Sequence, residues 1–439
     1  MKYLSYHILT IGCQMNKSDS ERIASYLNSF SLRKASIKFA DIVLLNTCGV
    51  RQRAEDRVYT LVRNIKRDNP KNKLIITGCL ARRKDVQRRL SAQVDLFMPI
   101  NNLPELIPTL MKKVAVNNLF FLDKDSDTIR QKQGERYLEI EAEYESKFSA
   151  FVPIGNGCDN FCSYCVVPYA RGREVYRPYD KIISEVKRLI NKDYKEISLI
   201  AQNVNSYRYK DKDFSDLLLA IDNLPGDFIL RFSSSHPKNV SDKLIQALGK
   251  TKKLANHFHL ALQSGDNDIL EKMNRKYRVE NYLETISKIR KVKPEIAITT
   301  DIIVGFPSET KKQFLNTVSV FKKVCFDFAY ISRYSPRPFT AAYSLKDDVS
   351  LAEKKNREDI LNEVLSKTAV ERNKIYLNKI VRVLVESRGK KNRYFAKTSS
   401  YKNVSFLSDN KDIIGKFVKV KIEEVYDFGL KAKFIEICK

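Results

Sequence analysis

The chain has no long apolar run. Although 43% of its 439 residues are hydrophobic, no stretch reaches the roughly 18–20 consecutive apolar residues that a membrane-spanning helix needs. The opening residues, MKYLSYHILTIGC, are too short and too strand-like for a secretory signal peptide. We therefore expect a protein of the cytoplasm that neither crosses nor binds a membrane.

Acidic residues are also scarce. The chain carries 52 Asp and Glu against 79 Lys and Arg, a formal net charge of +27. A polyanionic partner, most simply a nucleic acid, would account for this excess. A genome of biased composition is the other explanation, because the chain is rich in Lys, Asn and Ile generally. Charge alone leaves both explanations open.

The eight cysteines lack the setting of a disulfide framework, because the chain is long and shows no export signal. Three of them, Cys158, Cys162 and Cys165, have the spacing C-x3-C-x2-C. Three thiolates so close in sequence can hold three irons of a 4Fe–4S cube and leave the fourth iron open to a small molecule. Zinc is the main alternative. A closed zinc site needs four ligands, and no His or fourth Cys lies near enough in sequence.

A second set of cysteines lies in the first ~120 residues, where apolar runs alternate with helix-like segments as in a doubly wound parallel sheet. Cys13, Cys48 and Cys79 each follow a predicted strand. The carboxyl ends of parallel strands share one edge of the sheet, and ligands bind along that edge. We therefore predict a second cluster there. The alternative is three buried cysteines that act as small hydrophobic side chains.

The length suggests about three domains. We predict an N-terminal α/β domain (1–122), a charged linker without an apolar period (123–147), a partial (β/α)6 barrel (148–372) and a small antiparallel β-barrel (373–439). The barrel core rests on six candidate strands within FVPIG, EISLIAQNV, FILRFSSS, HFHLALQS, EIAITTDIIVGF and FDFAYISRYS.

The terminal region has 16 Lys and Arg against 7 Asp and Glu, with Tyr394, Phe395 and Phe406 interspersed. This composition suits phosphate contact and base stacking. Ordinary core aromatics are the alternative.

The run GCDNFCSYC, continued by VVPYARGRE, together with GCQMNKSDSE, NTCGVRQRAED and TGCLA, resembles the radical S-adenosylmethionine (SAM) methylthiotransferases. The last domain resembles the TRAM RNA-binding domain. The resemblance implies that Cys158, Cys162 and Cys165 hold a cluster whose open iron is chelated by SAM, which is cleaved to a 5′-deoxyadenosyl radical. It also implies that Cys13, Cys48 and Cys79 hold an auxiliary 4Fe–4S cluster, the sulfur source, and that two SAM molecules are used per turnover.

The same resemblance implies SAM contacts at the later strand ends. Amide and hydroxyl groups can hold the ribose and methionine parts, and a glycine permits close backbone approach. Each of these residues could equally be a turn residue or a polar group of the barrel core. The expected contacts are Gln202, Asn203, Arg231, Ser234, Gln263, Ser264, Asp301 and Gly305.

Six other residues of chemical interest receive no role in this set. Arg171 and Arg173 could steer RNA phosphates or support the cysteine loop, and we assign His236 and His259 no metal role. Cys325 and Cys438 have no partners at ligand spacing and are interpreted as packing or incidental residues.

The form GCQMNKSDSE is most similar to the MiaB branch, which acts at C2 of N6-isopentenyladenosine 37 in tRNA. A second branch, on threonylcarbamoyladenosine 37, more often has GCKVN, and a third (RimO) modifies an aspartate of a ribosomal protein. The expected partners are a tRNA anticodon loop, an electron donor such as flavodoxin or ferredoxin, and iron–sulfur assembly or sulfur-donor proteins. We expect a monomer.

The chain departs from the family pattern at several positions. Where relatives commonly have YSPR-x-GTPAA, this chain has YSPRPFTAAY, with Phe339 for Gly and Ala341 for Pro. Tyr176 replaces a Ser, and Ala396 and Lys397 replace the usual GR. Two other classes of function remain. An RNA-binding protein with structural clusters would not cleave SAM, and a radical SAM enzyme that only methylates would not need the second triplet.

Overall fold

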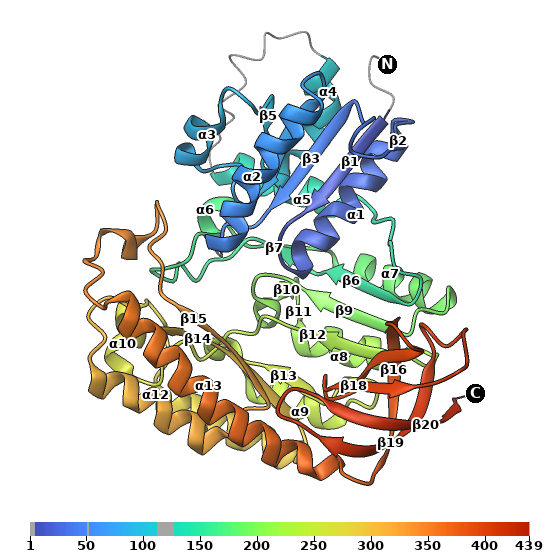
Figure 1. Cartoon of the computed structure of the whole chain (residues 1–439), viewed down its shortest axis with the longest axis vertical. Coiled ribbons are helices and arrows are strands. Elements are labelled where there is room, and N and C mark those ends of the chain that lie inside the picture. The colour runs from blue at the N-terminus through green and yellow to red at the C-terminus, as the bar shows by residue number, and fades with distance from the viewer. Residues whose placement is uncertain (1–4, 51, 112–126, 439) are drawn as a thin grey trace.

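The computed structural model of the chain describes residues 5–50, 52–111 and 127–438. Figure 1 shows three parts: an N-terminal α/β domain at the top, a crescent of strands and helices below it, and a small barrel beside the crescent that ends at the C-terminus. No helix among these residues combines the length and the apolarity that crossing a membrane requires.

The N-terminal domain is built on five parallel strands in the order β2-β1-β3-β4-β5. Strands β3 and β4 are apolar and almost fully buried, as expected for strands covered on both faces. The doubly wound prediction is confirmed. The elements are β1 (Ser5–Thr10), α1 (Gln14–Ser29), β2 (Arg33–Lys34), β3 (Ile42–Thr47), α2 (Gln52–Asp68), β4 (Lys73–Gly78), α3 (Lys84–Leu90), β5 (Leu96–Phe97), the 3-10 helix η1 (Ile100–Glu105) and α4 (Leu106–Met111).

The segment predicted as a linker contains a helix, α5 (Asp127–Glu139), and residues 123–126 lie outside the described residues. Tyr137 and Leu138 are buried in the N-terminal core together with Val175. The Tyr137 hydroxyl donates a hydrogen bond to Asp19. A short polar helix of this kind is stabilised by tertiary contacts at few positions, so its sequence shows no strong apolar period.

The central part has the six parallel strands that the sequence predicts. They form two three-stranded sheets, β6-β9-β12 and β13-β14-β15, which parallel bridges join at Leu230–Leu254 and Ser235–Leu260. The strands are β6 (Ser149–Pro153), β9 (Glu196–Ile200), β12 (Ile229–Phe232), β13 (His257–His259), β14 (Ala297–Val304) and β15 (Phe328–Arg333).

Helices cover the outer face of this open barrel, and their apolar sides pack into its core. They are α7 (Tyr179–Asn191), α8 (Phe214–Asp222), α9 (Asp242–Lys250), α11 (Val279–Val292), α12 (Lys311–Val324) and α13 (Leu351–Asn373). Shorter elements at the strand ends are β7 (Gly155–Asn156), α6 (Val167–Arg171), β8 (Val175–Tyr176), η3 (Val204–Ser206), β10 (Arg208–Tyr209), β11 (Lys212–Asp213), η4 (Pro237–Asn239), α10 (Asn267–Lys272) and η5 (Ala341–Ser344).

The terminal domain is a closed five-stranded barrel in the order β16-β17-β18-β20-β19. All pairs are antiparallel except β18–β20, which is parallel. It follows the 3-10 helix η6 (Lys374–Tyr376) and consists of β16 (Ile380–Arg388), β17 (Arg393–Thr398), β18 (Asn403–Leu407), β19 (Phe417–Val425) and β20 (Leu430–Ile437).

Two of the three aromatic residues expected to stack on RNA lie inside this barrel. Tyr394 and Phe406 are buried, with ring centroids 5.9 Å apart, whereas Phe395 is half-exposed. The first two are therefore core residues. They alternate with outward-facing residues along their strands, which places them on the inner face.

The β17–β18 turn docks the terminal barrel on the central part. Arg231 of β12 donates hydrogen bonds to the carbonyls of Thr398 (2.9 Å) and Ser399 (3.0 Å). Tyr401 stacks on His257, and Lys402 Nζ lies 2.7 Å from the Asp327 carboxylate. The last domain is thus fixed to the base of the open barrel by polar contacts that are largely buried.

Candidate active site

Cys13, Cys48 and Cys79 lie at the carboxyl edge of the N-terminal sheet, as the strand pattern indicates. Cys13 is the N-cap of α1, Cys48 follows β3, and Cys79 follows β4. A Cβ atom on Gly49 would lie only 3.2 Å from that of Cys79, so the loops after β3 and β4 are in contact. The arrangement places thiols from three loops at one end of the domain.

Cys158, Cys162 and Cys165 lie on the loop between β7 and α6. Gly157 begins this loop at φ +87°, where a Cβ would lie 2.0 Å from the Arg173 carbonyl, so only glycine fits. The loop is closed by hydrogen bonds from the Cys158 amide to Gly172 and from the Cys165 amide to Cys162. These contacts hold the three cysteines in one tight loop.

Burial disfavours the charged form of these thiols, and hydrogen-bond donors beside two of them favour it. Burial raises the pKa of Cys158 to about 11. The pKa of Cys165 is also raised, by burial and then by Cys162, Cys158 and Cys79. Asn160 Nδ2 and the Arg275 guanidinium approach the sulfurs of Cys158 and Cys162 at 3.5 and 3.4 Å. Such donors stabilise sulfur that carries negative charge in an iron–sulfur site.

The residues fit a cluster better than a single ion. Among the described residues, no three His, Cys, Asp or Glu side chains are grouped tightly enough to hold one metal ion. The ligands of one zinc ion surround a single atom, whereas each ligand of a cube binds a different iron and can stand farther from the others. Two buried cysteines with hydrogen-bond donors at their sulfurs, and a third cysteine of intermediate exposure, therefore fit an iron–sulfur group at the cysteine loop.

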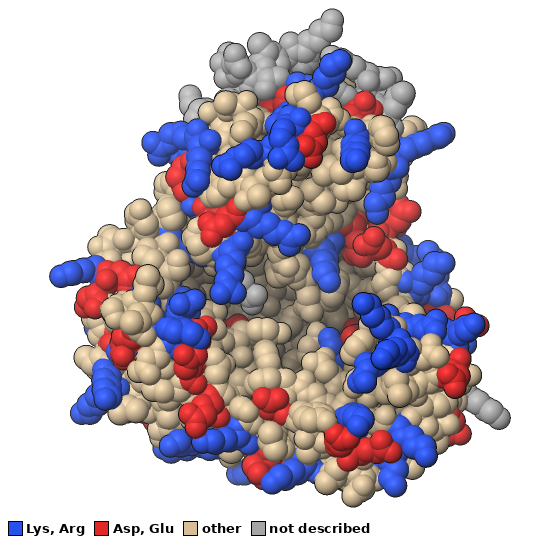
Figure 2. Space-filling view, viewed as in Figure 1, with Lys and Arg blue, Asp and Glu red and all other residues tan. Residues whose placement is uncertain are grey.

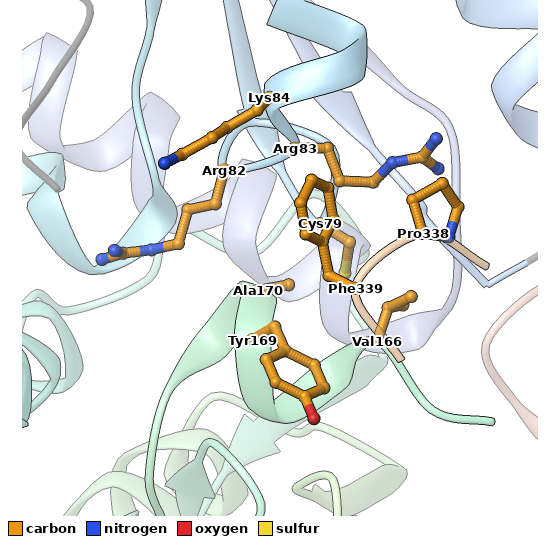
Figure 3. Close-up of a pocket in the computed structure, with 9 residues that line it drawn as sticks. All are labelled: Cys79, Arg82, Arg83, Lys84, Val166, Tyr169, Ala170, Pro338 and Phe339. Atoms are coloured by element: carbon orange, nitrogen blue, oxygen red, sulfur yellow. The ribbon is translucent and has the colours of Figure 1, made fainter. Parts of the chain in front are cut away.

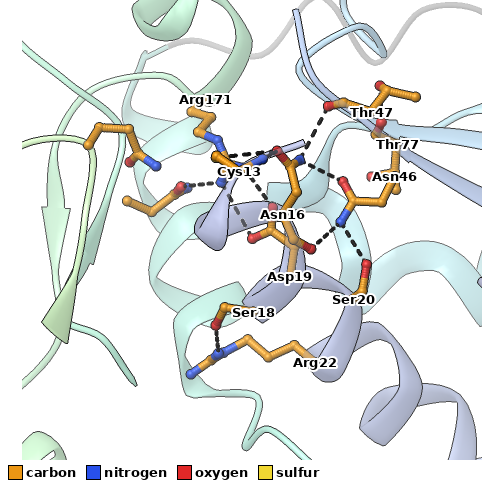
Figure 4. A network of polar contacts seen from close by, with 12 residues as sticks. Cys13, Asn16, Ser18, Asp19, Ser20, Arg22, Asn46, Thr47, Thr77 and Arg171 are labelled. Atoms are coloured by element: carbon orange, nitrogen blue, oxygen red, sulfur yellow. Dashed lines mark hydrogen bonds and ion pairs between the residues drawn. The ribbon is translucent and has the colours of Figure 1, made fainter. Parts of the chain in front are cut away.

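Arg171 connects the two sets of cysteines (Figure 4). Its guanidinium lies 2.6 Å from Asp19 Oδ2 and 3.0 Å from Asn156 Oδ1, and both Arg171 and Asp19 are buried. Burial raises the pKa of the Cys79 thiol, and the charge and hydrogen bond of Arg171 oppose that rise. Of the two roles considered for Arg171, support of the loop is the one its contacts favour. Arg173 remains half-exposed beside Asp159.

Some of the residues expected to contact SAM present unused polar atoms at the strand ends. Asn203 Oδ1 and Gln263 Oε1 are buried and have no hydrogen-bond partner within the described part of the chain, and the same is true of the neighbouring Ser235 Oγ. Buried polar atoms are normally paired, and each unpaired one calls for an explanation. A polar ligand at the open end of the barrel would supply the missing partners.

Other members of that set are engaged by the protein itself. Arg231 binds Glu196 and the terminal domain, Gln202 Oε1 accepts from the Gly157 amide, and Ser264 Oγ accepts from the Asp266 amide. Asp301 pairs with His259 at 3.1 Å.

Ser234 and Gly305, the last two of the expected SAM contacts, are distinguished by their backbone conformation. Ser234 and Gly305 have positive φ, and a Cβ on Gly305 would lie 2.3 Å from Lys354 Cγ. The close neighbour that requires glycine at position 305 is thus a lysine of α13.

No sequence motif predicts that Arg275 lies at the cysteine loop. Its guanidinium is buried against Cys162 Sγ and the Ala261 carbonyl, and Tyr277 lies beside it. The contact with Cys162 spans 113 positions of the chain. His236 lies near this group, and burial, then Arg275 and Lys238, lower its pKa to about 2, so it is neutral.

A cavity of about 160 Å³ opens between the N-terminal domain and the cysteine loop (Figure 3). Cys79 belongs to its wall, and Arg82 and Lys84 extend away from Cys79 at its edge. Figure 2 shows the larger hollow between the upper domain and the crescent, with Lys and Arg side chains along its upper rim. The full lining is Cys79, Arg82, Arg83, Lys84, Val166, Tyr169, Ala170, Pro338 and Phe339.

Comparison with known proteins agrees with this architecture. Family profiles match residues 5–98 (uncharacterized protein family UPF0004), 152–321 (radical SAM superfamily) and 374–435 (TRAM domain). Among solved structures, the chain is similar to the radical S-adenosylmethionine methyltransferase TsrM from Kitasatospora setae. The TM-score is 0.58 at 13% identity, over 78% of this chain and 75% of that one. The fold and the cysteine loop thus define a radical SAM enzyme with an N-terminal α/β domain and a TRAM domain.

Relatives with closer sequences narrow the class. The protein named tRNA-2-methylthio-N(6)-dimethylallyladenosine synthase from Thermoanaerobacter sp. (strain X514) is 40% identical to this chain, over 100% of this chain and 94% of that protein. The protein of that name in Finegoldia magna is 37% identical, over 98% and 95%. The chain belongs to this family of radical SAM methylthiotransferases, and the family implies an iron–sulfur cluster and SAM.

Proposed function

We propose that the chain converts N6-isopentenyladenosine 37 of tRNA to its 2-methylthio derivative, with SAM and two 4Fe–4S clusters. The observation that carries this proposal is the proximity of the two cysteine triplets. Cys79 of the N-terminal set lines one cavity together with Val166 and Ala170, which follow Cys165 of the loop, and Arg171 comes next in the sequence. A sulfur source must lie beside the centre that activates the substrate carbon, and this arrangement supports the proposal.

Each group of residues has a role in this scheme. Cys158, Cys162 and Cys165 would hold one cluster and Cys13, Cys48 and Cys79 the other. When bound, the first would supply the electron that cleaves SAM, since no side-chain acid or base breaks an unactivated C–H bond near neutral pH. Arg275 and Asn160 hydrogen-bond the sulfurs of the loop. Asn203 and Gln263 would orient SAM through their unpaired oxygens.

The proposal includes the partners that the chemistry requires. A small electron carrier such as flavodoxin or ferredoxin would reduce the loop cluster. Iron–sulfur assembly or sulfur-donor proteins would restore the sulfur that each turnover removes. The terminal barrel, basic and fixed to the core, would contact the tRNA outside its anticodon loop.

The test is an anaerobic reaction of the reconstituted protein with dithionite, SAM and isopentenylated tRNA, followed by nucleoside mass spectrometry. We expect one methylthio group on isopentenyladenosine. Replacing Cys13, Cys48 and Cys79 together by Ala should abolish this product and preserve 5′-deoxyadenosine, and Cys325→Ala is the matched control. Formation of 5′-deoxyadenosine with unchanged isopentenyladenosine would refute the substrate, and the threonylcarbamoyl tRNA and the ribosomal protein would be tried next.

A further inference from the structure

Phe339 occupies a backbone position that favours glycine. Its φ is +70°, and the Thr340 amide donates a hydrogen bond to the Arg337 carbonyl (3.3 Å), which closes a four-residue turn. Pro338 is second and Phe339 third in this turn, the order of a type II turn, whose third residue is normally Gly or Asn. A bulky residue is strained there, and such strain is found preferentially at functional sites.

The surroundings hold this turn firmly in place. The Arg337 guanidinium donates to the Val50 carbonyl (3.0 Å) and to Gln52 Oε1 (2.8 Å), both just after Cys48. Thr340 Oγ1 donates to the Arg337 carbonyl at 2.7 Å. The ring of Phe339 is therefore presented from a rigid support beside the N-terminal cysteines.

Phe339 is one of three exposed aromatic residues around the cysteine sites. Its exposed fraction is 50%, and those of Tyr169 and Phe161 are 45% and 37%. Phe339 and Tyr169 line the cavity that contains Cys79 (Figure 3), and the rings of Tyr169 and Phe161 meet edge to face at 6.2 Å. The three rings thus form one discontinuous aromatic surface that is partly exposed in the described part of the chain.

Cationic side chains accompany these rings. Arg82 and Lys84 belong to the same cavity, and the Arg173 guanidinium lies 5.0 Å from the centre of the Phe161 ring. Aromatic rings that stack with bases, set among cations that follow the backbone, are the usual composition of a surface for single-stranded nucleic acid. The cations attract the phosphates of an RNA backbone. The exposed rings favour RNA over an acidic segment of a protein, because only the RNA has bases that stack on them.

We propose that Phe339, Tyr169 and Phe161 stack against the unpaired bases that flank the target adenosine, while Arg82, Lys84 and Arg173 contact their phosphates. The target base must leave the anticodon-loop stack to reach the cysteine sites, and the bases beside it then lose a stacking partner. The aromatic surface replaces that partner. This inference rests on the proposed function, because it takes the substrate to be an RNA loop.

The test measures binding of an isopentenylated anticodon stem-loop RNA that carries 2-aminopurine next to the target adenosine. With wild-type protein we expect quenching of the 2-aminopurine fluorescence, which reports stacking. In Phe339→Gly we expect loss of most of the quenching and about tenfold weaker binding. Glycine relieves the positive φ, so the thermal stability of this variant should hold or rise, which separates the effect from misfolding. Phe39→Ala, at a ring that is 80% exposed elsewhere, is the matched control.

The outcomes separate this inference from the proposed function. Unchanged quenching and affinity in Phe339→Gly and in Tyr169→Ala, with normal methylthio product, would overturn the inference and leave the function standing. Ring-dependent quenching without methylthio product from wild-type protein would refute the function and support the surface. Tight binding of the ribosomal-protein substrate, with no binding of the RNA, would overturn both.

Discussion

At the scale of single residues, the meeting of the two cysteine sets depends on a buried ion pair. Arg171 and Asp19 are 3% and 0% exposed (Figure 4). Tyr137 donates a hydrogen bond to Asp19, and Arg171 donates one to Asn156. Asp19 lies on the helix that Cys13 begins, and Arg171 lies on the helix that follows Cys165. The pair therefore sets the position of one cysteine set relative to the other.

Replacing Arg171 by Met should destabilise the protein by about 3–5 kcal/mol, because the Asp19 carboxylate would remain buried without its partner. Urea unfolding followed by circular dichroism measures this. The double variant Asp19→Asn, Arg171→Met should recover part of the loss, and Arg173→Met, on a half-exposed neighbour, should change the stability little. Equal effects of the two single arginine variants would contradict the role of the pair.

Glu21 makes the stability depend on pH. Burial raises its pKa to about 7, and one carboxylate oxygen is buried without a partner in the described part of the chain, although the Glu145 amide donates to the other. The raised pKa means that folding favours the protonated acid. This stabilisation is complete below the ordinary value near 4.5 and is lost as the pH rises through about 7.

We therefore expect Glu21→Gln to be more stable than the wild type at pH 8, by about 2–3 kcal/mol, with a gap that shrinks as the pH falls toward 4.5. Unfolding curves across this pH range, with the exposed Glu139→Gln as control, measure the gap. A difference that does not change with pH would contradict the prediction.

At the scale of elements, the walls of the cavity are joined by one carboxylate. Glu55 of α2 is buried and accepts from Arg83, after β4, at 2.5 and 3.0 Å. It also lies 3.4 Å from Arg337, after β15. Three elements from two domains thus share a single buried acid, which explains why the turn that carries Phe339 is held against the N-terminal domain.

Glu55→Gln should loosen this junction, because the buried Arg337 would lose the counter-charge of Glu55 and Arg83 would be left with Asp85. We expect the unfolding free energy to fall by about 2–4 kcal/mol and proteolysis within 334–345 to become faster. Asp56→Asn, at the exposed neighbour, is the matched control. If cleavage were equally slow in both variants, Glu55 would not be the anchor of the turn.

At the scale of the whole molecule, the excess positive charge has a surface to act on. Lys and Arg side chains line the upper rim of the hollow between the N-terminal domain and the crescent (Figure 2), and the terminal barrel adds a net charge of +9. The barrel is fixed to the core through Arg231 and Lys402, so its surface and the hollow form one rigid frame for a folded RNA.

Binding of the anticodon stem-loop should weaken with salt. We expect log K to fall linearly with log salt concentration, with a slope of about −0.7 for each phosphate contacted on a single strand. The double variant Arg82→Gln, Lys84→Gln should reduce the magnitude of the slope by about 0.7–1.4. Titrations between roughly 50 and 200 mM salt measure it. An unchanged slope would show that these two cations contact no phosphate.

Much of the fold and part of the site could be predicted, because they depend on local pattern. Strand and helix periods identified the six β/α units and the terminal barrel, and strand-end positions placed Cys13, Cys48 and Cys79 on one edge. Helix α5 was missed because few of its positions are apolar. The sequence alone did not place Tyr394 and Phe406 in the barrel core, because the tertiary structure decides which face of a strand points inward.

The sequence by itself determined the cysteine spacing, the order of the domains and the basic charge, because these depend only on which residues occur and in which order. Only the tertiary structure decided the partners of the charged residues. Arg171 meets Asp19 across 152 positions, Arg231 meets the terminal domain across 167, and Arg275 meets Cys162 across 113. A charged side chain takes its role from its burial and its counter-charge, and both exist only once distant segments have packed together.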